Sequence, residues 1–151
     1  MKDLCSSFPN ILITPLKIID VPGGAVMHAM KAGDSGFNKY GEAYFSNIES
    51  GAIKAWKRHT QMTMNLVVPC GAVRFVVYDD RFGSQTINRF QQVMLGADNY
   101  CRLTIPPMLW VGFQGVDKNT STILNIADIV HVAGESDRKD IHELDFNWER
   151  V

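Results

Sequence analysis

Short runs of β-forming residues, separated by turn residues, recur through the middle of this sequence. No amphipathic helical period of about 12 residues or more competes with them. The clearest run is residues 72–78, in which Val73, Phe75 and Val77 share one face of a strand. Eight such runs predict an all-β sandwich or barrel. The other predicted strands cover residues 43–48, 53–59, 65–68, 87–94, 101–105, 110–115 and 122–126.

The length of 151 residues is typical of one domain, so a single domain over residues 1–151 is expected. Hydrophobic residues make up 46% of the chain, which is enough to form a core. Residues 23–40 are predicted to form a loop or a short helix over the mouth of the barrel, because they hold Gly, Asp, Ser and Asn among few apolar residues. Residues 134–140 are predicted to be a solvated turn before a last strand-like or helical piece that ends at Trp148.

The charge balance and the cysteines exclude several classes of partner. The 15 Lys and Arg residues nearly cancel the 16 Asp and Glu residues, so no overall field attracts nucleic acid or an anionic membrane. Residues 11–30 are interrupted by Pro, Gly and charged residues, and predict neither a membrane helix nor a signal peptide. Cys5, Cys70 and Cys101 form no CxxC pair and no complete disulfide set, which favours free thiols and a cytoplasmic location.

The densest polar cluster lies on the predicted strand at residues 53–59. Strict alternation puts Ala55, Lys57 and His59 on one face, and Lys54 on the other face with Trp56 and Arg58. If the first face points into a barrel, an ammonium and an imidazole stand about 6 to 7 Å apart over a bound ligand. That pair suits an anionic or enolate-forming substrate. The alternative is an exposed edge strand whose positive charges discourage aggregation.

Sequence motifs for metal or cofactor chemistry are missing. The four histidines are scattered, with no HxH, ExxH or HExxH spacing, so no metal ligand set is predicted. A nucleophile elbow, a phosphate loop and a dinucleotide fingerprint are also absent. The remaining chemistry is acid/base catalysis without a cofactor, or binding alone.

Four segments in order resemble motifs of the dTDP-4-dehydrorhamnose 3,5-epimerase family. Residues 51–57 (GAIKAWK) resemble its G-V-L-R-G-L-H, and residues 79–86 (DDRFGSQT) resemble its D-L-R-x-G-S-P-T. Residues 95–99 (LGADN) and 105–113 (IPPMLWVGF) are similar to its L-S-x-E-N and I-P-x-G-F-A-H-G-F. The resemblance implies a metal-independent cupin, a jelly-roll barrel that acts on nucleotide-linked 4-keto sugars in polysaccharide (lipopolysaccharide or O-antigen) biosynthesis. It also implies a homodimer in which the barrels exchange N-terminal strands.

The chain departs from this family at the catalytic positions. Lys57 stands where the resemblance implies the histidine base, Val111 stands at a second histidine, and Ile129 lies where a tyrosine donates a proton. Removal of a proton next to a ketone needs a base within about 2.6 to 3.2 Å. His59 is predicted to be that base, because its unperturbed pKa is near 6.5. Lys57 is predicted to act with it, and would be a base itself only if desolvation, Arg58 or Lys54 lowered its pKa.

Other residues are predicted to bind the nucleotide sugar. Lys54 occupies the family's arginine position and is expected to contact phosphate, and Arg81 and Arg102 are further candidates. Trp110 is expected to stack on the base or sugar, and Gln61 and Asn65 to hydrogen-bond sugar hydroxyls. The predicted function is a nucleotide-sugar epimerase or isomerase without a cofactor. The alternative is a degenerate cupin that binds a sugar nucleotide or a partner enzyme without turnover.

Overall fold

The structure is a computed structural model, and it describes residues 8–150. Within this range the chain forms strands and one short 3-10 helix. The elements are β1 (Leu12–Pro15), β2 (Ile18–Val21), β3 (Gly24–Met27), β4 (Glu42–Ile48), β5 (Ile53–His59), β6 (Met64–Cys70), β7 (Ala72–Asp79), β8 (Arg89–Gly96), β9 (Cys101–Ile105), β10 (Trp110–Gly115), β11 (Ser121–Ala127), β12 (Ser136–Arg138) and η1 (Ile141–Glu143).

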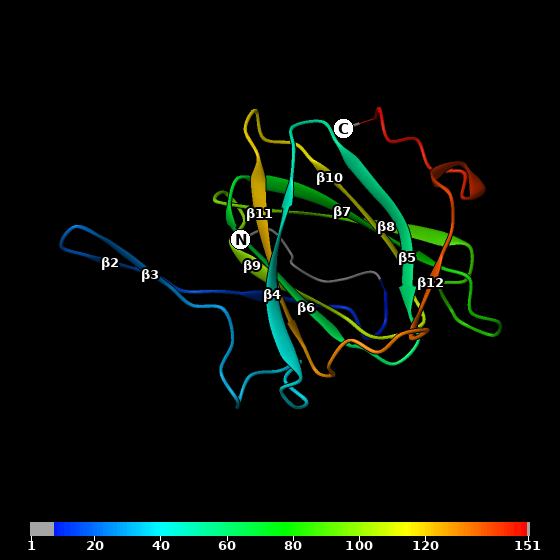
Figure 1. The fold of residues 1–151 in the computed structure, drawn as a ribbon, viewed down its shortest axis with the longest axis horizontal. Coiled ribbons are helices and arrows are strands. Elements are labelled where there is room, and N and C mark those ends of the chain that lie inside the picture. Colours follow the sequence, from blue (N-terminus) through cyan, green and yellow to red (C-terminus); the bar gives the residue numbers. More distant parts are fainter. Residues whose placement is uncertain (1–7, 151) are drawn as a thin grey trace.

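The strands form two antiparallel sheets of five strands each and a separate hairpin. Sheet I has the order β1-β9-β6-β11-β4, and sheet II has the order β12-β5-β10-β7-β8. The hairpin β2–β3 extends away from the two sheets (Figure 1). All eight strands predicted from the sequence are present, with ends that differ by at most two residues. The predicted all-β jelly-roll fold is therefore confirmed.

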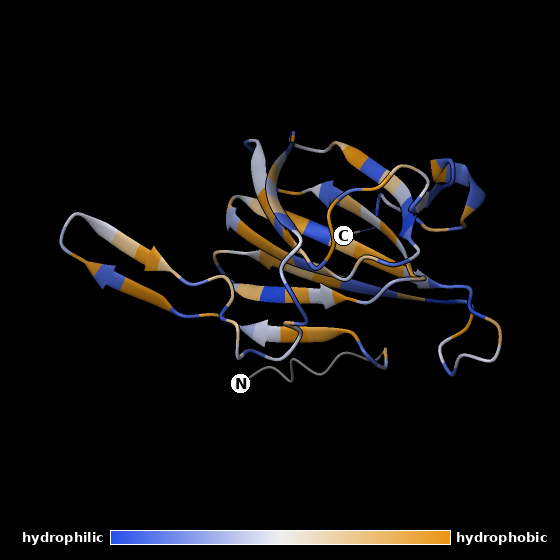
Figure 2. Ribbon diagram, turned by 60° about the horizontal axis from the view of Figure 1, so that its bottom comes forward, coloured by the Kyte–Doolittle hydropathy of each residue, from blue (hydrophilic) through white to orange (hydrophobic). Residues whose placement is uncertain are grey.

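The hydrophobic core lies between the inner faces of the two sheets. On β7, Val73, Phe75 and Val77 point into this core, whereas Val76 packs on the outer face of sheet II. On β9, Leu103 belongs to the core while its neighbours along the strand point outward. The alternation follows from the two-residue period of a strand, and Figure 2 shows apolar and polar residues alternating along the ribbons.

The C-terminal segment covers the outer face of sheet II. The rings of Trp148 and Trp56 have centroids 5.2 Å apart, and Trp110 belongs to the same cluster. Gly112 leaves room for this contact, because a Cβ at that position would lie 2.9 Å from the Trp148 ring. Arg74 is buried on this face and donates a hydrogen bond to the backbone carbonyl of Trp148. The segment is thus fixed by both apolar packing and a buried guanidinium.

Two predictions outside the eight strands are wrong in part. Of residues 23–40, residues 28–40 do form a loop, but this loop does not lie over the barrel mouth and it follows a strand. Gly24–Met27 is a strand of the hairpin, and residues 29–36 are held on the outer face of sheet I by Arg102 and Asn65. Residues 134–140 are not a solvated turn either, because β12 pairs with β5 and extends sheet II, and Glu135 is buried.

Candidate active site

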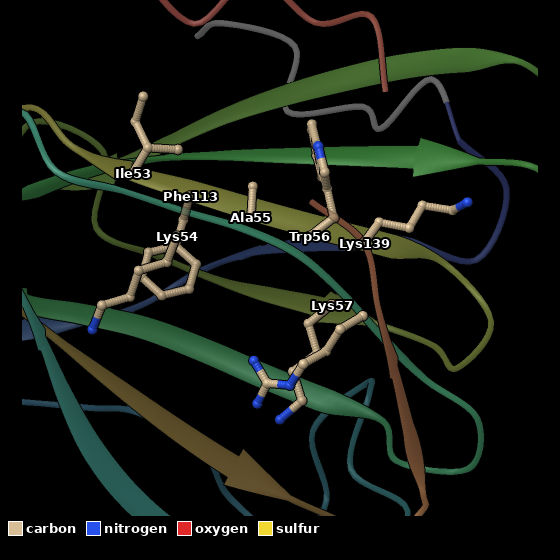
Figure 3. Close-up of a pocket in the computed structure, with 8 residues that line it drawn as sticks. Ile53, Lys54, Ala55, Trp56, Lys57, Phe113 and Lys139 are labelled. Atoms are coloured by element: carbon tan, nitrogen blue, oxygen red, sulfur yellow. The ribbon is translucent and has the colours of Figure 1, made fainter. Parts of the chain in front are cut away.

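The basic residues of the candidate site lie on β5, whose pairing with β10 changes register. Lys57 lies opposite Val111 and Lys54 lies opposite Phe113, so one residue of β10 faces two residues of β5 between these pairs. Paired residues share a face of the sheet, and Val111 and Phe113 both pack against the core. Lys54 and Lys57 therefore lie on the inner side of β5, opposite to Trp56 (Figure 3).

The placement of Lys54 corrects the prediction from strict alternation. That prediction put Lys54 on the face of Trp56, but the extra residue of the bulge reverses the alternation, and Ala55 packs with the outer cluster. Lys57 and His59 share the inner face, as expected. The alternative of an exposed edge strand is wrong, because β5 lies between β12 and β10.

A cavity of about 400 Å³ opens beside these residues. This volume lies within the usual range of small-molecule sites. Arg138 lies opposite Lys57 on β12 and joins Lys54 and Lys57 in the lining, together with the Phe113 ring. Lys139 also borders the cavity, but its ammonium lies 5.0 Å from the centroid of the Trp110 ring on the outer face of sheet II. None of the lining residues is acidic, so the cavity suits an anionic ligand.

Lys57 is partly buried beside a second cation, Arg138. Burial lowers the pKa of its ammonium, and the charge of Arg138 lowers it further, while Glu135 opposes both effects. Arg58 does not contribute as expected from the sequence. It points to the outer face, where its guanidinium binds Asp137 and Asp80.

His59 and Glu135 form a buried pair two residues beyond Lys57. The Nδ1 atom of His59 lies 2.7 Å from Oε2 of Glu135, and both side chains are almost fully buried. Glu135 was missed in the sequence because it lies in a run of charged and small residues that is typical of a solvated turn. Only the pairing of β12 with β5 brings it to His59.

Glu135 stays ionised in this environment. Its other oxygen, Oε1, accepts hydrogen bonds from the backbone N–H groups of Gln61 and Met62, each at 3.0 Å. Burial alone would raise the pKa of Glu135, but the hydrogen bonds from His59 and from the two backbone groups outweigh burial and lower it to about 2. The carboxylate therefore favours the imidazole tautomer that has a proton on Nδ1.

The second ring nitrogen of His59 contacts no polar group of the described residues. Nε2 has no hydrogen-bond partner among residues 8–150. Three fully buried side-chain atoms of this range lack a partner, and Nε2 is not one of them. They are Arg74 Nε, Arg102 Nε and Trp148 Nε1. With Nδ1 donating to Glu135, Nε2 has a lone pair available. This is the state that a general base requires.

Two of the predicted substrate-binding residues lie on the wrong face of sheet I. Asn65 is buried on the outer side, where its amide accepts a hydrogen bond from Thr104 and donates one to the Gly36 carbonyl. Arg102 is fully buried on the same side and binds Asp34 and two backbone carbonyls. The prediction that they contact the substrate at the barrel mouth is therefore wrong.

Arg81 and Trp110 also lie outside the cavity, contrary to prediction. Arg81 makes a bidentate ion pair with Asp79. The Asp79 carboxylate also accepts hydrogen bonds from Ser84 and Thr86. The segment that resembles D-L-R-x-G-S-P-T is thus a turn built around one buried carboxylate. Trp110 packs on the outer face of sheet II, where its Nε1 donates to Asp80 at 2.8 Å.

The predicted contacts of Gln61 with sugar hydroxyls and of Lys54 with phosphate stay predictions. Gln61 follows β5, its side chain is exposed, and its backbone N–H binds Glu135. The ammonium of Lys54 donates one hydrogen bond, to the Asn47 carbonyl at 2.9 Å, and retains two N–H groups for a ligand.

The described residues contain no candidate metal site. Within residues 8–150, no group of three or more His, Cys, Asp or Glu side chains is placed to hold a metal ion. None of the helical segments described is long and apolar enough to cross a membrane.

At the positions of the family's second histidine and tyrosine, Val111 is part of the core and Ile129 packs against it.

Comparisons with known proteins identify relatives over most of the chain. A crystal structure of a dTDP-sugar isomerase from Desulfovibrio desulfuricans G20 superimposes with a TM-score of 0.91 and 37% sequence identity, covering 95% of this chain and 94% of that one. Two curated proteins are more distant. The probable low-salt glycan biosynthesis epimerase Agl13 of Haloferax volcanii is 26% identical over 122 residues, which are 78% of each chain. The spore coat polysaccharide biosynthesis protein SpsL of Bacillus subtilis is 27% identical over 113 residues, 72% of this chain and 75% of its own length. No family model matches the chain.

Proposed function

The chain belongs to the family of dTDP-sugar isomerases, and we propose that it moves protons next to the ketone of a nucleotide-linked 4-keto sugar. Its role is that of a nucleotide-sugar epimerase or isomerase in polysaccharide biosynthesis, as the names of its relatives indicate. The observation that carries the proposal for the site is the buried His59–Glu135 pair, whose histidine lies two residues along β5 from Lys57 of the cavity lining.

The reaction needs a base and a place for negative charge. His59 Nε2 takes the proton from the carbon next to the ketone, and the electron pair moves to the ketone oxygen to form an enolate. Glu135 keeps the imidazole in the reactive tautomer and stabilises the imidazolium that forms. Lys57 shares the inner face of β5 and supplies positive charge for the enolate oxygen.

The diphosphate is proposed to bind at the basic end of the cavity. Lys54 and Arg138 line it, and neither is paired with a carboxylate among residues 8–150. Phosphate oxygens accept charge-assisted hydrogen bonds from both residue types. Binding there would place the sugar toward Lys57 and His59, farther along the same face of β5.

The experiment that tests this function follows exchange with solvent. Purified protein is incubated with dTDP-4-keto-6-deoxyglucose in D₂O, and mass spectrometry and NMR measure deuterium at C3 and C5. We expect incorporation by the wild type and a loss of about 10²–10⁴-fold in His59→Gln. His142→Gln is the matched control, because His142 is exposed on η1.

Two results would contradict the proposed reaction. One is a wild type that exchanges no proton of this or a related keto sugar. If calorimetry then shows binding of the nucleotide sugar, the protein is the non-catalytic binding cupin. The other is a His59→Gln variant that folds, by its thermal unfolding, and exchanges at the wild-type rate.

We further propose a homodimer that forms through the N-terminal region. The hairpin β2–β3 pairs with neither sheet, and its apolar residues are exposed, among them Ile18, Ile19 and Val26. A second copy would cover these side chains. Light scattering is expected to give twice the monomer mass, and a mass that stays monomeric at all concentrations would overturn this.

Free thiols at Cys70 and Cys101 support a cytoplasmic location, while Cys5 lies outside the described residues.

A further inference from the structure

Tyr44 faces the interior of the barrel from the sheet opposite His59. It lies on β4 and pairs with Asn125 of β11. On β11, Ile123 and Ala127 belong to the core, and Asn125 shares their face because it lies two residues from each. Paired residues share a face, so Tyr44 also points inward. Because β4 is an edge strand of sheet I, the Tyr44 side chain remains 39% exposed.

The hydrogen bonds of Asn125 determine the direction of the bond to Tyr44. The Oδ1 atom of Asn125 accepts a hydrogen bond from the backbone N–H of Asn65 at 3.1 Å, and a backbone N–H can only donate. The amide is therefore not free to flip, and its Nδ2 must face the phenol, where it donates to Tyr44 Oη at 2.9 Å. Since the phenol oxygen accepts this bond, its own proton is left for another acceptor. No described residue takes it.

Contacts link the phenol to the His59–Glu135 pair. Asn125 Nδ2 lies 3.9 Å from the sulfur of Met62, whose backbone N–H donates to Glu135. In addition, β4 and β5 are consecutive strands joined by the turn at residues 49–52 (Figure 1). Tyr44 and Lys57 lie equally far from the ends of that turn, four residues from Ile48 and from Ile53 respectively. Tyr44 and Lys57 are thus inward-facing residues of two consecutive strands, one in each sheet.

We infer that Tyr44 is the second acid/base residue of the site and donates a proton to the face of the sugar opposite His59. This inference rests on the proposed function and makes the reaction an inversion, not only an isomerisation on one face. His59 Nε2 removes a proton and the C–H electron pair forms the enolate. The enolate carbon then takes the Tyr44 proton from the other side, and the ketone re-forms. The phenolate is reprotonated by solvent and the imidazolium releases its proton to solvent, so the cycle balances.

The test separates proton exchange from inversion. Tyr44→Phe removes only the hydroxyl, and we expect it to exchange deuterium into dTDP-4-keto-6-deoxyglucose at the wild-type rate, with retained configuration. Its formation of the inverted product should fall by about 10²–10⁴-fold. Tyr78→Phe is the matched control, because the Tyr78 hydroxyl binds Asn88 and its ring packs on the outer face of sheet II. NMR coupling constants of the product report the configuration.

Asn125→Asp tests the role of the amide with a different readout. A carboxylate still accepts the Asn65 N–H but turns the Tyr44 hydroxyl toward itself, so the phenol proton is no longer free. We expect inversion to fall while exchange persists, a split that a purely structural defect would not produce.

Three outcomes have distinct meanings. A Tyr44→Phe variant that inverts as fast as the wild type overturns the role of Tyr44 alone, and so does a wild type that exchanges without inverting. A wild type that does not exchange overturns the proposed function, and with it this inference.

Discussion

His59 and Glu135 are 76 residues apart in the sequence, yet Nδ1 of the imidazole lies 2.7 Å from Oε2 of the carboxylate. The carboxylate is held in turn by two backbone N–H groups at the end of β5. A histidine oriented in this way has one nitrogen fixed and the other available. The predictions below follow from this arrangement and from the residues around it.

Glu135→Gln should impair catalysis more than binding. An amide cannot stabilise the imidazolium as a carboxylate does, and it can favour the wrong tautomer. We expect kcat to fall by about 10²–10⁴-fold, with KM nearly unchanged. The measurement is the initial rate of conversion of the keto sugar in quenched samples. The exposed Glu149→Gln is the control. Equal losses in both variants would contradict the role of Glu135.

The same residue should make stability depend on pH. Its pKa is about 2 in the folded protein and 4.5 when unperturbed, so it binds protons more weakly when folded. Its contribution is therefore fully present above pH 4.5 and is lost as the pH falls toward 2. The free energy of unfolding, measured with urea, should fall more steeply over this pH window for the wild type than for Glu135→Gln. Parallel curves for the two proteins would disagree with this assignment.

Lys54→Met should weaken substrate binding. One charge-assisted hydrogen bond to phosphate contributes about 1.5 to 3 kcal/mol, so we expect KM to rise about 10- to 100-fold with little change in kcat. Added salt should raise KM less in the variant than in the wild type, because one attraction has been removed. Lys118→Met changes an exposed lysine in a turn and serves as the control. An unchanged KM would remove Lys54 from the phosphate site.

Arg102→Lys should cost stability without affecting KM. The guanidinium donates to Asp34 and to the carbonyls of Ala29 and Ser35, and an ammonium cannot reproduce this fork. We expect a loss of about 2 to 4 kcal/mol in the free energy of unfolding by urea. The exposed Arg89→Lys should leave unfolding unchanged. A raised KM with normal stability would instead restore Arg102 to the binding site.

Much of the fold was predictable because strand formation is a local property. Residues 72–78 alternate between core-facing and outward-facing side chains, and the turn residues around them set where the strand ends. The β2–β3 hairpin and β12 were missed for a physical reason. The hairpin lacks a buried face, and β12 has three polar or charged residues that become a strand only by pairing with β5.

The candidate site divides in the same way. The sequence by itself predicted the fold class and placed Lys57 and His59 on one face of a strand, because both follow from alternation, and the intrinsic pKa of histidine made His59 the predicted base. Only the tertiary structure decided which charges meet. It brought Glu135 to His59, reversed the face of Lys54 through a bulge, and turned Asn65 and Arg102 away from the cavity. Such contacts join residues far apart in the chain, and they depend on which strands pair and on where bulges fall, which alternation within one strand does not specify.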